Sequence, residues 1–189
     1  MEKYLGIYRI PTARLQSWDY GNNAAYFITI CTNNRKHYFG KIVEGVMHLN
    51  ALGKLAHTHW LKILEDYNFV ELGSFVVMPN HFHGILIINK EEKEPLTPEE
   101  YNAKNLCLDE KRGGITRDKN PMMNENISQI IRRFKGRCAF EMCKINPEFA
   151  WQSRFHDHII RNIVKFELIQ NYIETNSLVW EKDKFYTNT

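Results

Sequence analysis

An α+β fold is predicted for this chain, with one antiparallel sheet packed against helices and an extra helix at the C-terminus. The predicted elements follow the order strand, helix, strand, strand, helix, strand, helix. The first six match the split βαβ sandwich of ferredoxin-like domains. At 189 residues, the chain is long enough for one well-packed domain, 1–189, and short for two.

The composition is that of a globular protein, with 43% hydrophobic and 25% charged residues. The net charge of +3 permits a polyanionic partner. No apolar run approaches the roughly 18 residues that span a bilayer, and the N-terminus has no apolar signal core. We therefore expect a cytoplasmic protein without a membrane partner. The four cysteines form no CxxC pair, which disfavours a zinc knuckle or a disulfide framework.

The first half of the chain begins with a polar segment, 1–25, which we interpret as an N-terminal arm. The β-branched and aromatic run 26–32 predicts a strand. Residues 42–49 contain Glu-Gly and predict a small hairpin. Asn50 can cap a helix over 51–65, where apolar residues recur at helical spacing.

Two apolar runs, 69–78 and 81–89, are separated only by Pro79-Asn80, and they predict an antiparallel hairpin. Both faces of the second run are largely apolar, which indicates a strand near the centre of the sheet. Residues 90–124 are charged, contain three prolines and show little periodicity. They predict a long loop insertion.

The remaining elements are a helix, a strand and a final helix. Asn126 and Gln129 resemble a capping box that opens a helix over 127–143. The core-facing residues of that helix are predicted to be Ile127, Ile131, Phe134 and Cys138. Residues 154–160 predict a strand, and the last helix is expected to end near Asn176.

The sharpest local feature is the sequence His81-Phe82-His83. On a strand, side chains alternate, so the two histidines lie on one face and Phe82 lies on the other. Two imidazoles about 7 Å apart can converge on one metal ion. The alternative is a pair of partly buried histidines that hydrogen-bond to backbone groups.

Two other His-x-His pairs compete with this site. His156 and His158 lie on a predicted strand and could also converge on an ion. His57 and His59 lie in a helical segment, where positions two apart differ by about 200° around the axis. The helical pair therefore cannot face one ion.

Four segments together resemble a known family. The run Phe75-Val-Val-Met-Pro-Asn-His-Phe-His-Gly-Ile-Leu-Ile88 resembles the histidine–hydrophobe–histidine (HUH) strand of HUH single-tyrosine transposases. Tyr26 to Phe39 resembles their first strand, while Trp151 to Arg161 and Tyr172 to Asn176 resemble their last strand and nucleophile helix. Within that family, the chain resembles the transposases associated with repetitive extragenic palindromes (REP). Ser177 is a departure, because relatives often carry proline there.

The resemblance implies that Tyr172 is the nucleophile, carried by the extra C-terminal helix, and that Asn176 completes the metal site. The helix geometry is compatible with both roles. Tyr172 lies at the shoulder of the apolar stripe, and Asn176 follows one turn later, about 40° away around the axis. The two side chains can therefore reach the same pocket.

With His81 and His83, Asn176 would offer two neutral imidazoles and one amide oxygen. Such a set suits a divalent ion with open positions, so we expect Mg²⁺ or Mn²⁺ as cofactor. The chain has no GxxxxGK[ST] phosphate loop, and no nucleotide cofactor is expected.

The activity that the resemblance implies is metal-dependent cleavage and rejoining of single-stranded DNA at hairpin sites. It proceeds through a covalent 5′-phosphotyrosine and a free 3′ hydroxyl. The expected partner is single-stranded or hairpin DNA, the expected location is the nucleoid, and the protein would be a monomer or a homodimer. The alternatives are a non-catalytic protein that binds palindromes and a relaxase or replication initiator with the same chemistry. Initiators often carry a second tyrosine, whereas Tyr172 is alone in the last helix.

Basic residues outside the core stripe of the 127–143 helix are predicted to contact DNA. They are Arg132, Arg133, Lys135 and Arg137. Further candidates are Arg35, His158 and Arg161. The alternative is that this helix simply presents a solvated charged face.

Overall fold

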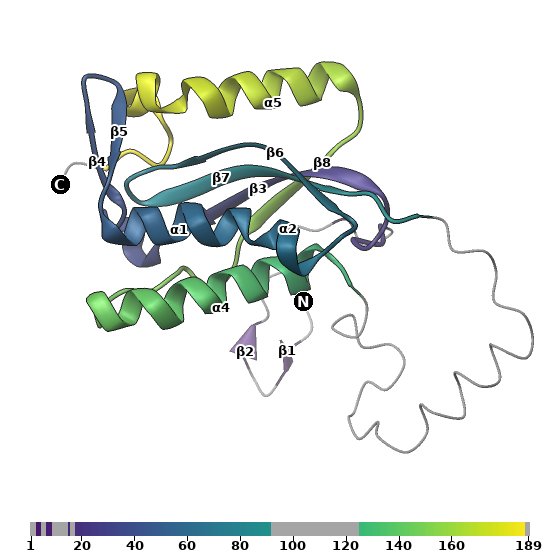
Figure 1. Ribbon diagram of the computed structural model, residues 1–189, viewed down its shortest axis with the longest axis horizontal. Helices are drawn as coiled ribbons and strands as arrows, with labels where there is room; N and C mark the ends of the chain where they lie inside the picture. Colours follow the sequence, from purple (N-terminus) through teal and green to yellow (C-terminus); the bar gives the residue numbers. More distant parts are fainter. Residues whose placement is uncertain (1–2, 5–6, 9–14, 16–17, 92–124, 188–189) are drawn as a thin grey trace, which may run out of the picture.

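A four-stranded antiparallel sheet forms the centre of the computed structural model, which describes residues 3–4, 7–8, 15, 18–91 and 125–187 (Figure 1). The strand order is β6 (Val70–Val77), β7 (His81–Ile88), β3 (Ala24–Cys31) and β8 (His156–Ile160). Because β7 pairs antiparallel with both β3 and β6, those two run parallel with β7 between them. This is the split βαβ arrangement, and it confirms the predicted fold.

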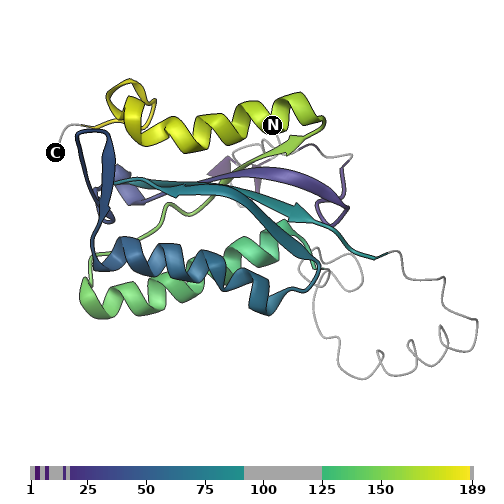
Figure 2. The ribbon, with the colours of Figure 1, turned by 45° about the horizontal axis from the view of Figure 1, so that its top comes forward.

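Helices cover both faces of the sheet (Figure 2). One face carries α1 (Ala51–Leu61), α2 (Ile63–Asp66) and α4 (Ile127–Ile145). The other face carries α5 (Ile163–Thr175), which continues into the 3₁₀ segment η3 (Asn176–Lys182). We call these the α1/α4 face and the α5 face.

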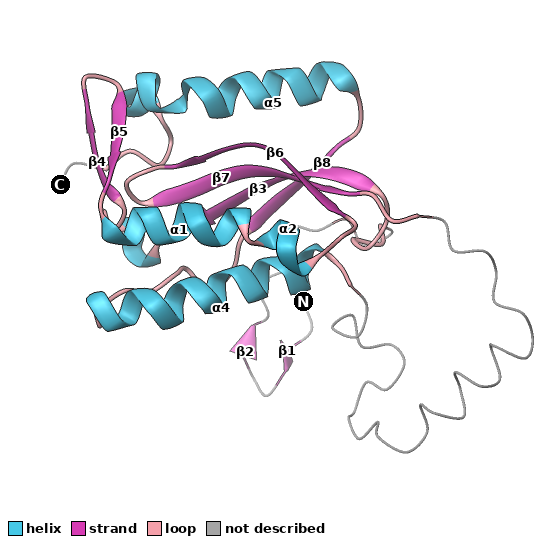
Figure 3. Cartoon of the chain, in the orientation of Figure 1, coloured by secondary structure: helices cyan, strands magenta, loops and turns pink. Residues whose placement is uncertain are grey.

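The smaller elements lie around this sandwich (Figure 3). The predicted hairpin at 42–49 is confirmed as β4 (Gly40–Val43) and β5 (Val46–Leu49). A short 3₁₀ turn, η1 (Asn33–Arg35), follows β3. Near the N-terminus β1 (Lys3–Tyr4) pairs with β2 (Ile7–Tyr8), and the side chain of Trp18 packs against the core. Nearly all of the predicted insertion at 90–124 lies outside the described residues.

Asparagine caps begin the three long helices. Asn50 accepts a hydrogen bond from the backbone N–H of Gly53, Asn126 from two N–H groups of α4, and Asn162 from that of Lys165. The capping box at α4 is only half formed, because Gln129 Oε1 is buried without a hydrogen-bond partner in the described part of the chain. The predicted helix over 51–65 is in fact two helices, since α1 ends at Leu61.

Two apolar clusters fix the sheet between its helices. The larger one fills the α1/α4 face and includes Trp60 and Phe82, while the smaller one lies under α5 around Ile85 and Ile173. Gly84 allows a close approach between β7 and α1 on the α1/α4 face, because a Cβ atom there would lie 2.8 Å from Cζ2 of Trp60. Within the described ranges, the helices are all too short or too polar to cross a membrane.

Candidate active site

The predicted histidine pair lies on the α5 face. His81 and His83 follow each other at alternate positions of β7, with ring centroids 4.5 Å apart. Their side chains are 0% and 1% exposed. Phe82 points the opposite way, into the larger cluster. The alternation of the strand therefore brings the two imidazoles together, as the sequence predicted.

Hydrogen bonds orient both rings. His81 Nδ1 lies 2.8 Å from Oδ1 of Asn80 and donates to it, because the amide nitrogen of Asn80 is engaged with the carbonyl of Phe185. His83 Nδ1 lies 2.9 Å from Oγ1 of Thr29 on the neighbouring strand. The Nε2 atom of His81 is then a lone-pair donor, buried without a hydrogen-bond partner among the described residues. A metal ion is the kind of group that such an atom can bind.

Burial keeps both imidazoles neutral. It lowers the pKa of His81 to about 3, and the positive charges of Arg35 and Lys184 act in the same direction. Burial, together with the neighbouring His81, lowers the pKa of His83 well below its ordinary value. Neutral imidazole is the form that ligates metals, so the pair is in its ligating form at physiological pH.

Helix α5 delivers Tyr172 to this pair. The hydroxyl oxygen lies 3.3 Å from Nε2 of His83 and donates a hydrogen bond of 3.0 Å to Oδ2 of Asp183. The ring packs edge-on against Phe27, which also stacks on His83. Burial, followed by the nearby charge of Asp183, raises the pKa of Tyr172 to about 12.

Asn176 enters the same pocket one turn after Tyr172. Its side chain is 0% exposed, and Nδ2 donates a hydrogen bond of 3.0 Å to Oδ2 of Asp183. Its carbonyl oxygen, Oδ1, is buried and has no hydrogen-bond partner in the described ranges. Asn176 Oδ1 and His81 Nε2 are thus two buried ligand atoms whose bonding capacity is unused.

Asp183 is a member of the site that the sequence did not predict. After η3, the chain turns back, and the carboxylate of Asp183 comes to lie beside the histidines. The ligand atoms of His81, His83 and Asp183 lie within 4.8 Å of one another. Two imidazoles with carboxylate and amide oxygens fit a divalent ion. No sequence spacing marks Asp183, since it lies in an irregular segment and is placed by tertiary packing.

Aromatic side chains of the C-terminal segment (176–187) cover the histidines. The ring centroid of Phe185 lies 4.7 Å from that of His81 and 5.7 Å from that of His83. Trp180 packs on the same imidazole of His81 at 5.9 Å. This cover explains why two polar rings are almost completely buried although they face a single helix.

The competing pair does not form a comparable cluster. His156 and His158 lie on β8, share its α5 face and are exposed. Within the described residues, the one group of three or more histidine, cysteine or acidic side chains with metal-binding geometry is that of His81, His83 and Asp183. The arrangement therefore favours the pair on β7.

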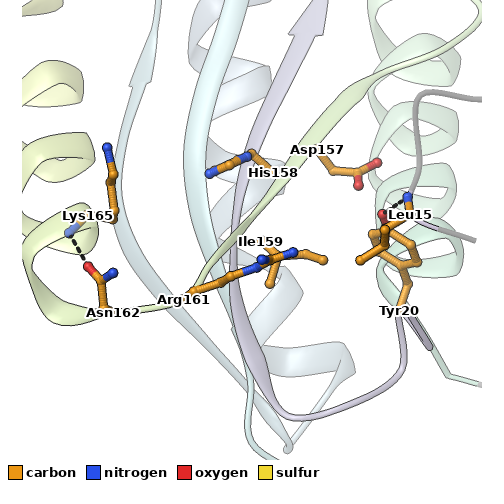
Figure 4. A pocket seen from close by; sticks show the side chains of 8 residues that line it. All are labelled: Leu15, Tyr20, Asp157, His158, Ile159, Arg161, Asn162 and Lys165. Carbon is orange, nitrogen blue, oxygen red and sulfur yellow. Dashed lines mark hydrogen bonds between the residues drawn. The ribbon is translucent and has the colours of Figure 1, made fainter. Parts of the chain in front are cut away.

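Three of the predicted DNA-contacting residues lie along β8 or beside the histidines. Arg35 lies over the ring of Phe185, 5.1 Å from its centroid, and donates to the carbonyl of Lys184. His158 and Arg161 line a hollow of about 430 Å³ between β8 and the start of α5 (Figure 4).

The other predicted residues lie on α4, and the sheet separates them from the histidines. Arg133 and Arg137 both form ion pairs with Asp66 at the end of α2. Lys135 donates to the carbonyl of Gln152, at 2.6 Å, and Arg132 is exposed on the same helix. The structure therefore does not bring the α4 residues together with Tyr172 and the histidines.

The sequence is similar to that of a bacterial protein. A protein of Haemophilus influenzae, described as uncharacterized, is 32% identical over 185 residues, which are 97% of this chain and 96% of that one. This chain belongs to the same family. The description of that relative states no activity, so membership in its family does not assign one to this chain. No family model matches the chain.

Among solved structures, a REP-associated tyrosine transposase bound to a REP hairpin has a similar fold. The TM-score is 0.56 at 18% sequence identity, and the match covers 92% of this chain and 77% of the transposase chain. This chain therefore has the fold of a tyrosine transposase over most of its length.

Proposed function

We propose that this protein is a metal-dependent transposase that cleaves and rejoins single-stranded DNA at hairpin sites. The observation that carries the proposal is the contact of the half-buried Tyr172 hydroxyl with the buried His83, in a cluster that also holds Asp183 and Asn176. The hairpin bound to the transposase of similar fold supports the choice of substrate. The three predicted DNA contacts along β8 or beside the histidines, Arg35, His158 and Arg161, belong to the same proposal.

His81, His83 and Asn176 would hold the metal ion, with Asp183 as a further oxygen in reach. A divalent ion bound there, Mg²⁺ or Mn²⁺, would polarise a non-bridging phosphate oxygen and offset charge in the transition state. The two unused ligand atoms support this set, because buried polar atoms without partners are rare in native proteins.

Tyr172 supplies the nucleophile. Its hydroxyl oxygen attacks the phosphorus, the P–O3′ bond breaks, and the 3′ oxygen leaves and takes up a proton as a free hydroxyl. Asp183 Oδ2 already accepts the hydrogen bond of the Tyr172 hydroxyl, so it is placed to receive the proton that this hydroxyl loses on attack, while the leaving 3′ oxygen takes its proton from water. The product is a 5′-phosphotyrosine. Attack by a 3′ hydroxyl on this ester reverses the reaction and joins strands without a nucleotide cofactor.

A gel assay tests the proposal. The protein is mixed with a labelled single-stranded hairpin oligonucleotide and Mn²⁺ and run under denaturing conditions. We expect a slowly migrating covalent adduct that disappears with chelator and in Tyr172→Phe. Tyr186→Phe is the matched control, because it removes a hydroxyl from an exposed tyrosine of the C-terminal segment and should leave the adduct intact. Salt-sensitive binding with no adduct would contradict cleavage and favour a non-catalytic palindrome-binding protein.

A further inference from the structure

Two hollows open along β8, which is an edge strand of the sheet next to β3. The first has a volume of about 380 Å³, and His156 is among its lining residues. The second, of about 430 Å³, is the one that His158 and Arg161 line at the start of α5 (Figure 4). His156 and His158 are two residues apart on one face of the strand, so the hollows follow each other along β8.

The first hollow is lined by basic and aromatic side chains, which suit a ligand that carries both negative charge and aromatic rings. Its basic side chains are those of Arg35, Arg154 and Lys184, and the described residues that line it include no carboxylate. Phe155 and Phe185 supply aromatic walls. Basic side chains that follow a phosphate backbone, combined with aromatic rings on which bases stack, are the features that bind single-stranded nucleic acids.

The second hollow continues the positive charge. Arg161 and Lys165 line it and supply two cations, and His158 lines it as well. Among the described residues of its lining the acid is Asp157, which lies on the opposite side of the strand from His158 (Figure 4). Arg161 and Lys165 are exposed, so their charged groups are accessible.

The first hollow adjoins the candidate active site directly. Thr29 lines it and also hydrogen-bonds to His83 at 2.9 Å. Phe185, another wall of the hollow, is the ring that packs on both histidines. A ligand in this hollow would therefore lie one side chain away from His83, across Thr29 and Phe185.

We propose that these two hollows bind the single strand that flanks the hairpin, so that the strand runs along β8 and its scissile phosphate reaches Tyr172. The inference rests on the proposed function, and it adds the path of the substrate. It assigns DNA contacts to Arg154 and Lys165, which the sequence analysis did not predict. These two residues and the predicted contact Arg161 would bind the same strand.

The test compares three hairpin oligonucleotides: a blunt one, one with a thymidine extension on its 5′ side and one with the same extension on its 3′ side. Binding is measured by fluorescence anisotropy over a range of salt concentrations, with chelator present so that no cleavage occurs. The variants are Arg154→Ala and Arg161→Ala. Lys54→Ala is the matched control, since it removes one exposed positive charge from α1 on the opposite face.

We expect each β8 variant to weaken binding of at least one of the two extended hairpins severalfold. The slope of log K against log salt should become shallower by about 0.7, the value for one phosphate contact on a single strand. Binding of the blunt hairpin should not change, and Lys54→Ala should alter the binding of none of the three. Because both arginines are exposed, thermal melting should show that the variants remain folded.

Two results would overturn the strand path. One is that the slope of log K against log salt is the same in both β8 variants as in Lys54→Ala, whether the extension is on the 5′ or the 3′ side. The other is an equal loss of affinity for blunt and extended hairpins, which would assign the arginines to the duplex. If the Tyr172 adduct still forms in either case, the proposed function stands without this path. If the slopes fall as expected but no adduct forms, the path along β8 is supported and cleavage is contradicted.

Discussion

The same strands present apolar side chains on one face of the sheet and polar, site-forming side chains on the other. On the α1/α4 face, β7 contributes Phe82 and Leu86 to a large apolar cluster between the sheet and two helices. On the α5 face, the alternate residues of β7 are His81 and His83, and the apolar cluster under α5 is much smaller. One face thus stabilises the sheet, while the other holds polar groups in fixed positions.

The comparison teaches how buried polar groups are maintained in this protein. The apolar face holds β7 in place, and the alternation of the strand then puts both imidazoles on the α5 face. The C-terminal segment supplies the remaining partners, among them Asp183 and Phe185. We expect substitutions on the α5 face to change chemistry more than stability, and substitutions on the α1/α4 face to do the reverse.

The largest expected effect is that of His83→Gln. The variant loses an imidazole of the metal site, and adduct formation should fall by about 10³-fold. His57→Gln, at an exposed histidine of α1, should keep the full rate. Gel quantification of the adduct in a time course measures both rates. An undiminished rate in His83→Gln would show that the β7 pair takes no part in the chemistry.

The neighbouring Phe82→Ala should act on stability instead. Phe82 is fully buried against Trp60 and Phe134, so its truncation should lower the free energy of unfolding by about 3–5 kcal/mol. Urea denaturation followed by tryptophan fluorescence gives this value. A loss of less than about 1 kcal/mol would mean that the two faces do not divide their roles as described.

Asp183→Asn tests the group that the sequence left unmarked. The amide can still accept the hydrogen bond of Tyr172 but cannot take up its proton, so the adduct rate should fall by about 10²-fold. Glu181→Gln, at an exposed acid of the same segment, should leave the rate unchanged. A faster reaction in Asp183→Asn would contradict this role and show that the carboxylate competes with the DNA phosphate.

Acid should destabilise the metal-free protein through the two histidines. The unfolded chain protonates them below pH 6.5, whereas burial keeps the pKa of His81 near 3 in the folded state. The free energy of unfolding should therefore fall as the pH drops from 6.5 toward 3, by up to about 1.4 kcal/mol per pH unit for each histidine. Above pH 6.5, these groups contribute nothing. Urea titrations with chelator measure the slope, which should be shallower in His81→Gln; an unchanged slope would contradict the assignment.

The smallest expected effect is that of Asp66→Asn on the α1/α4 face. This change removes the partner of Arg133 and Arg137 and should cost about 1 kcal/mol or less, because both arginines are partly exposed. Adduct formation should not change. A large loss of adduct would mean that α4 positions the DNA, as the sequence analysis predicted for its basic residues.

The sequence predicted the features that depend on local periodicity. The alternation of β7 is enough to place His81 and His83 on one face, and the turn at Pro79-Asn80 predicts the hairpin of β6 and β7. The apolar character of both faces of 81–89 predicts that β7 lies inside the sheet, which the strand order confirms. The helical spacing of Tyr172 and Asn176 likewise predicts that both reach one pocket, which the structure confirms through their shared contact with Asp183. Their proposed roles came from the family resemblance.

Features that depend on tertiary packing were not predictable in this way. Asp183 reaches the histidines only because η3 turns the chain back over them, and no periodicity encodes that turn. The ion pairs of Arg133 and Arg137 depend on where α2 ends, at Asp66, after the break that divides the predicted helix over 51–65. Gln129 fits the capping-box pattern, yet its Oε1 atom has no described partner in the folded chain.

The most direct test of the central claim is to identify the residue that becomes linked to DNA. The adduct formed with a hairpin oligonucleotide and Mn²⁺ is digested with protease and nuclease, and the nucleotide-bearing peptide is sequenced by mass spectrometry. The site described here predicts the modification on Tyr172, through a 5′ phosphate. A nucleotide on any other residue, or a fully cleaved oligonucleotide with no modified peptide, would contradict it.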